Sequence, residues 1–101
     1  MKFCRTLDAK PGIGRTLAHQ LLRSGTSVGA NLEEAQAGQS RADFISKYSI
    51  ALKEARETIY WLRLLEAAEY STDGQCRTIQ KEADEIARII GSIIVHTKSK
   101  K

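Results

Sequence analysis

The feature that most constrains the fold is a series of apolar residues that recurs at alternating steps of three and four positions in the middle of the chain. Its members are Ile45, Tyr48, Leu52, Ala55, Ile59 and Leu62. This spacing places the side chains along one face of an α-helix and is typical of the seam of a helical bundle. The seam is widened on one side by Phe44, Ala51 and Leu65, as expected for a helix that packs against two neighbours. The sequence therefore predicts an all-α bundle.

Helix-breaking residues are few, and they divide the chain into three predicted helices. There is a single proline, Pro11, and the seven glycines are the other breakers in a chain otherwise rich in helix formers. At 101 residues the chain is expected to form one domain. The helices are expected at about residues 14–37, 40–69 and 73–98.

The ends of these helices and the segments outside them carry further expectations. Ser40, followed three residues later by Asp43, resembles a short capping box at the start of the second helix. Residues 1–12 are expected to be irregular or the remnant of a further helix, and residues 97–101 to form a basic tail. The third helix carries its own seam, which places Cys76 in the core and consists of Cys76, Ile79, Ala83, Ile86, Ile90 and Ile93.

The first predicted helix differs because its middle is made of small residues. Each glycine inside a helix lowers its stability by about 1 kcal/mol relative to alanine. A neighbouring helix that packs closely against Gly25 and Gly29 is expected to offset this loss. Ser27, Asn31 and Glu34 share one face of the same helix. They are expected to form a buried polar line in which Glu34 pairs with Arg or Lys of another helix or subunit, and the alternative is a solvated stripe.

The second helix also carries large apolar residues on the side opposite its seam, notably Tyr60, Trp61 and Leu64. Monomeric proteins rarely expose large contiguous apolar patches. One interpretation is a second interface that binds another copy or another protein. The alternative is that Trp61 and Leu64 pack beneath the first twelve residues of the same chain.

The charge of the chain is mildly basic and unevenly distributed. Sixteen Lys and Arg against twelve Asp and Glu give a net charge of +4. Residues 38–70 are neutral in sum, and both ends are basic. This excess is compatible with binding to a nucleic acid, although it is also common on solvated surfaces that bind none.

Compartment and chemistry are constrained mainly by what the sequence lacks. The first residues have no apolar core of a signal peptide, and the most apolar run is too short to cross a bilayer, so a cytoplasmic protein with reduced Cys4 and Cys76 is expected. His19 and His96 have no partners at zinc-ligand spacing, and the sequence predicts neither a metal site nor a cofactor. No arrangement of residues indicates a catalytic site, so an enzyme is not expected.

Three segments together resemble the 23S rRNA-intervening sequence protein family, also called the four helix bundle proteins. They are residues 23–35 (RSGTSVGANLEEA), 40–45 (SRADFI) and 50–57 (IALKEARE). The resemblance implies a left-handed, up-and-down four-helix bundle, assembly as a homo-oligomer that is typically a pentamer, and a relationship to the nucleic-acid-binding accessory variability determinants of retroelements. By this resemblance, the family's first helix is expected to be missing or truncated here. Either the recorded start is misplaced, or a partner must cover the exposed seam.

Two functional hypotheses follow. The first is an oligomeric RNA- or DNA-binding module that contacts phosphates without reading sequence. Its candidate residues are Arg15, Arg23, Arg41, Lys47, Lys98, Lys100 and Lys101. The second is a scaffold that docks a larger enzyme and binds no nucleic acid. Its candidate anchors are Tyr60, Trp61 and Leu64. The candidates for a polar network or an oligomer interface are Ser27, Asn31, Glu34, Glu57, Tyr60, Trp61 and Leu64.

Overall fold

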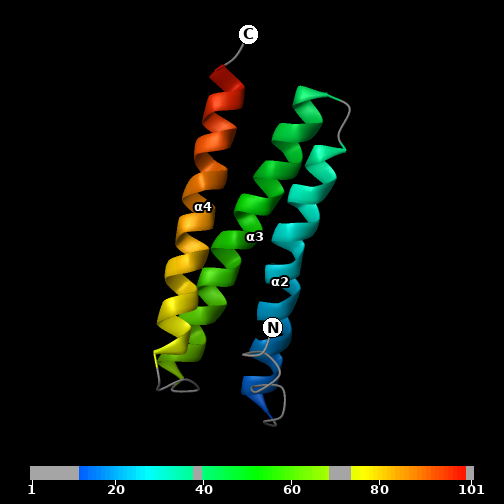
Figure 1. The fold of residues 1–101 in the computed structure, drawn as a ribbon. Coiled ribbons are helices and arrows are strands. Elements are labelled where there is room, and N and C mark those ends of the chain that lie inside the picture. Colours follow the sequence, from blue (N-terminus) through cyan, green and yellow to red (C-terminus); the bar gives the residue numbers. More distant parts are fainter. Residues whose placement is uncertain (1–11, 38–39, 69–73, 100–101) are drawn as a thin grey trace.

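The computed structural model describes residues 12–37, 40–68 and 74–99, and within these ranges the chain forms three α-helices. The helices are α2, Ile13–Gln36, α3, Arg41–Ala67, and α4, Gln75–Ser99. Their bounds agree with the predicted ones to within two residues, which confirms the all-α fold. Figure 1 shows the helices side by side, alternating in direction, with α3 in the middle. The predicted remnant of a first helix lies outside the described residues.

Local interactions explain where α3 and α4 begin. The Ser40 side chain accepts a hydrogen bond of 3.1 Å from the backbone N–H of Asp43, as the capping pattern predicted. Gly74 precedes α4 with a φ of 80°, a left-handed conformation that side chains with a Cβ rarely adopt. At the other end of α4, His96 and Lys98 lie in the last turn, where positive charge is favoured by the helix dipole.

The core lies along α3, in two clusters. The first joins the start of α2 to the end of α3 and the start of α4, and contains Leu17, Ala18, Leu21, Leu62, Leu65 and Cys76. The second lies toward the opposite end of the bundle, and contains Ala35, Tyr48, Ala51, Ile90 and Ile94. Cys76 is buried, as predicted from its position on the seam.

The seams are rotated slightly from their predicted positions. On α3, Ala51 and Leu65 are completely buried, whereas Leu52 and Ile59 are only half-buried at the edge. On α4, Ile86 was expected on the seam but has 44% of its surface exposed, and Ile94 is buried instead. The reason is that the backbone of α4 closely approaches that of α3 alone among the described helices. Among the described residues, no Cα atom of α4 lies within 8 Å of one in α2.

Candidate nucleic-acid interface

The structure does not gather the cations that were predicted to bind nucleic acid. Arg15 lies in the first turns of α2, whereas Arg41 and Lys98 lie at the opposite end of the bundle, where α3 begins and α4 ends (Figure 1). Lys100 and Lys101 lie outside the described residues. The two remaining candidates, Arg23 and Lys47, form ion pairs within the bundle. The predicted set therefore does not form one surface.

Arg23 is the centre of a polar network between α2 and α3. Its Nη1 lies 3.3 Å from Oε2 of Glu54, and its Nη2 pairs with Oε1 of Glu57. Its Nε donates to Oε1 of Gln20 at 3.1 Å. The Glu54 side chain is only 12% exposed, so its carboxylate needs the guanidinium beside it. These interactions make Arg23 a link between α2 and α3.

A pair of buried hydroxyl groups lies next to this network. The Thr58 hydroxyl lies 2.9 Å from the Ser24 hydroxyl and 2.8 Å from the carbonyl oxygen of Glu54. The Ser24 hydroxyl also donates toward the carbonyl oxygen of Leu21 at 3.3 Å. Both side chains are buried, and these bonds supply the partners that buried polar groups require.

The predicted polar line on α2 is divided in two. The Asn31 amide donates to the carbonyl oxygen of Ser27 at 2.9 Å and lies 3.2 Å from its hydroxyl, so these half-buried residues interact along their own helix. Glu34 pairs with Lys47 of α3 at 2.7 Å, but their side chains are 59% and 38% exposed. Glu34 therefore reaches another helix at the surface, and its expected burial is wrong.

A continuous basic surface is found instead on the outer side of α3. Lys53, Arg56, Tyr60 and Arg63 follow one another at helical spacing, and all four are exposed. We call these four residues the basic face. Within the described residues, none of its three cations forms an ion pair or a side-chain hydrogen bond. These cations are therefore available to an external anion.

The basic face was missed because charge was summed along the sequence. Residues 38–70 are neutral in sum, but α3 separates the two signs on different sides. Glu54 and Glu57 turn toward Arg23 of α2, while Lys53 and Arg56, their neighbours in sequence, turn outward. The spacing of three, four and three residues between positions 53, 56, 60 and 63 was the signal that could have found it.

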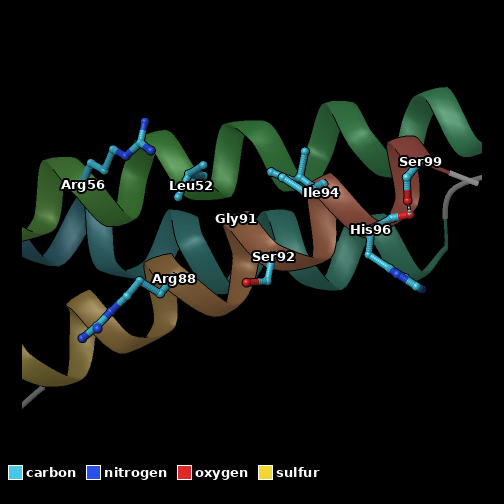
Figure 2. A pocket seen from close by; sticks show the side chains of 9 residues that line it. Leu52, Arg56, Arg88, Gly91, Ser92, Ile94, His96 and Ser99 are labelled. Carbon is cyan, nitrogen blue, oxygen red and sulfur yellow. Dashed lines mark hydrogen bonds between the residues drawn. The ribbon is translucent and has the colours of Figure 1, made fainter.

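A groove between α3 and α4 adjoins the basic face at Arg56 (Figure 2). Its volume is about 730 Å³. In Figure 2, Leu52 and Ile94 lie between the two helices, while Arg56 and Arg88 extend from opposite flanks. Arg88 is paired with Asp84 of its own helix at 2.8 Å. The groove thus has an apolar floor and one flank that carries an arginine with no ion pair among the described residues.

A second, smaller groove runs between α2 and α4, on the side where these helices do not meet. Its volume is about 180 Å³. Its lining comes from all three helices and consists of Gly25, Val28, Ala55, Ile79, Glu82, Ala83 and Ile86. The expected approach of another helix at Gly29 is not found, because a Cβ built there meets nothing within 4 Å. Gly29 therefore borders open space, whereas Gly25 lines the groove and is half-buried.

The three predicted anchors of α3 differ in exposure. Trp61 and Leu64 are half-buried and pack against the first core cluster, whereas 54% of the surface of Tyr60 is exposed. The indole N–H of Trp61 donates to Oε1 of Glu57 at 3.1 Å, which joins it to the Arg23 network. Of the three side chains, only that of Tyr60 is mostly exposed to solvent.

The described part of the chain offers neither a cluster of metal ligands nor a membrane-spanning helix. Residues 12–37, 40–68 and 74–99 contain no cluster of three or more His, Cys, Asp or Glu side chains that could hold a metal ion. In the same ranges, none of the helices combines the length and the hydropathy that crossing a membrane requires.

Comparison with known proteins places the chain in a family. A family model described as 23S rRNA-intervening sequence protein matches residues 13–92. The chain is also similar to the crystal structure of a protein of unknown function from the S23 ribosomal protein family of Bacteroides thetaiotaomicron. The two are 48% identical, with 92% of this chain and 82% of that chain covered and a TM-score of 0.81. No curated protein matches. Since the family model covers most of the chain, the protein belongs to the 23S rRNA-intervening sequence protein family.

Proposed function

We propose that this protein is a non-enzymatic, oligomeric module that binds RNA by phosphate contacts through the basic face of α3. The observation that carries the proposal is the separation of charge on α3. Lys53, Arg56 and Arg63 are exposed and form no ion pair within the described ranges, while the acids of the same segment turn toward α2. The pairing of Glu54 and Glu57 with Arg23 leaves a positive outer surface on a helix whose five cations and four acids nearly balance.

The dimensions of the basic face suit a nucleic-acid backbone. At a rise of 1.5 Å per residue, the ten steps from Lys53 to Arg63 span about 15 Å along the helix axis. By the spacing of duplex DNA, in which the phosphates of one strand rise by about 3.4 Å each, this length corresponds to roughly four phosphates. Contacts of this kind position a backbone and read no sequence. We therefore expect affinity without sequence specificity and a steep dependence on salt.

The test is the removal of the three cations together. We expect Lys53→Gln, Arg56→Gln and Arg63→Gln in one variant to weaken binding to a labelled RNA hairpin by about tenfold or more, because three phosphate contacts and their counterion release are lost. The slope of log affinity against log salt should become shallower by about 2–3. Fluorescence anisotropy at a series of salt concentrations measures both quantities.

A matched variant uses cations that lie elsewhere in the bundle. Arg15→Gln, Arg41→Gln and Lys98→Gln together remove the same charge, and we expect them to leave the affinity within about threefold of the parent, since a long-range field is screened beyond about 10 Å. Helix content and melting temperature of both variants are checked by circular dichroism. If the second variant loses binding and the first retains it, the basic face is not the interface.

Assembly is the other part of the proposal, and the α2–α4 groove supports it. Ile86 of α4 is 44% exposed and lines the groove together with Gly25 of α2, and Ile89, on the same helix, is 59% exposed. Isoleucines of one copy fit against a smooth glycine stripe of another, which would bury both. Five copies is the number that the family resemblance implies.

Assembly is checked by light scattering after size-exclusion chromatography. We expect Ile86→Glu to lower the particle mass toward that of a single chain, because a charge in the groove opposes burial. Ile50→Glu is the control, since Ile50 has a similar exposure of 39% but lies on α3, outside the groove. Equal masses for the parent and the Ile86 variant would exclude this groove as the assembly surface.

A scaffold that docks a protein is the second candidate function, and the apolar lining of the same groove favours it. The RNA-binding experiment distinguishes the two candidate functions. A protein that binds no RNA at low salt, where electrostatic attraction is strongest, would be assigned to the scaffold.

A further inference from the structure

Tyr60 occupies a position on the basic face that phosphate binding alone does not use. Arg56 lies one turn before it and Arg63 one turn after it on the same side of α3. The ring is more than half exposed, and its hydroxyl forms no hydrogen bond with any side chain or backbone group in the described ranges. An exposed aromatic ring between two cations is the combination by which proteins hold a nucleobase and its flanking phosphates.

The ring is held in place from behind. Its centroid lies 5.1 Å from that of Trp61, with the ring planes at 63°, an edge-to-face contact. Trp61 is fixed in turn by its hydrogen bond to Glu57, which pairs with Arg23 of α2. A ring ordered before binding loses less conformational freedom when a ligand stacks on it.

We propose that Tyr60 is a stacking platform for an unpaired nucleotide, and that the protein therefore prefers RNA with a bulge or single-stranded segment over a perfect duplex. This inference rests on the proposed RNA-binding function and specifies which class of RNA the protein binds most tightly. A base inside a duplex has both faces covered by its neighbours, so only an unpaired base can lie against the phenol ring. Arg56 and Arg63 then contact the phosphates on either side of the extruded base.

The preference is tested with two blunt-ended RNA duplexes that differ by one bulged nucleotide. We expect the wild-type protein to bind the bulged duplex more tightly. Tyr60→Ala should weaken binding to the bulged duplex by about 5- to 100-fold, the range that follows from loss of one stacked base. Binding to the perfect duplex, which depends on phosphate contacts, should weaken less than binding to the bulged duplex.

Two further variants separate stacking from simple packing. Tyr60→Phe keeps the aromatic face and should retain the preference, while Tyr60→Leu keeps an apolar side chain without that face and should lose it. A 2-aminopurine at the bulge reports stacking directly, because its fluorescence is quenched when the base stacks. We expect quenching with wild-type protein and Tyr60→Phe only. The emission of Trp61 shows whether each variant preserves the local packing.

The outcomes distinguish the inference from the function on which it rests. If the wild-type protein binds both duplexes equally and Tyr60→Ala changes neither, the stacking role is overturned and phosphate binding stands. An equal loss on both duplexes also overturns it, since stacking requires the unpaired base. If the wild-type protein binds neither duplex at low salt, the proposed function fails and the inference fails with it.

Discussion

Truncation of Leu21 to alanine is expected to lower the free energy of unfolding by about 2–5 kcal/mol. Leu21 is completely buried in the core cluster that joins all three helices. The substitution removes buried methyl groups and leaves a cavity, because the backbones of helices held by several neighbours relax only in part. A domain of this size is stabilised by about 5–15 kcal/mol, so the loss is a large fraction of the total.

The adjacent residue provides the matched control. Leu22 has the same chemistry and lies in the same helix, but 41% of its surface is exposed. We expect Leu22→Ala to cost less than about 1 kcal/mol, since little apolar surface is lost from the core. Urea denaturation followed by circular dichroism measures both values at one protein concentration, because assembly adds to apparent stability. Equal losses at the two positions would contradict the burial of Leu21 and the exposure of Leu22.

Replacement of Arg23 by methionine is expected to have the second largest effect, a loss of about 2–3 kcal/mol. Removing one partner of a buried ion pair typically costs 3–5 kcal/mol, because the other charge is left without compensation. Arg23 is 48% exposed, so water can partly solvate the remaining carboxylates and reduces the effect. Most of the lost stability is expected to arise from the unpaired carboxylate of Glu54, because Glu54 is the more buried of the two acidic partners of Arg23.

Two comparisons isolate this cause. Arg63→Met removes an arginine from the exposed face of α3 and should change stability by no more than about 0.5 kcal/mol. Glu54→Gln in the Arg23→Met background should recover part of the loss, because the unpaired charge is gone. The assignment of the network as a link between helices would be wrong if both arginine variants unfolded at the same urea concentration.

The sequence was sufficient to predict the helices because their signals are local. The spacing of apolar residues on α3, the cap at Ser40 and the scarcity of proline each act within a few residues, and tertiary packing did not override them. The exact seam was less predictable. Leu52 and Leu65 have the same side chain, but which of them is buried depends on where α2 and α4 lie around α3.

The candidate site was predicted less well, because it depends on which residues meet across helices. Arg23 was assigned to nucleic acid since its charge is visible in the sequence, whereas its pairing with Glu54, 31 residues later, requires the packing of α2 on α3. The same packing removes acids from the outside of α3 and creates the basic face. Similarly, Tyr60 and Trp61 are neighbours in sequence, but one turns outward and the other packs against the core.

The absence of backbone contact between α2 and α4 in the described ranges has a consequence for how the chain folds. The bundle consists of two helical hairpins that share α3, and each brings together only helices that are consecutive in sequence. Such short-range topology favours rapid folding, since little loop entropy is lost before contacts form. It also permits either outer helix to separate from α3 while the other hairpin stays assembled. In an oligomer, copies could therefore exchange an outer helix without unfolding completely.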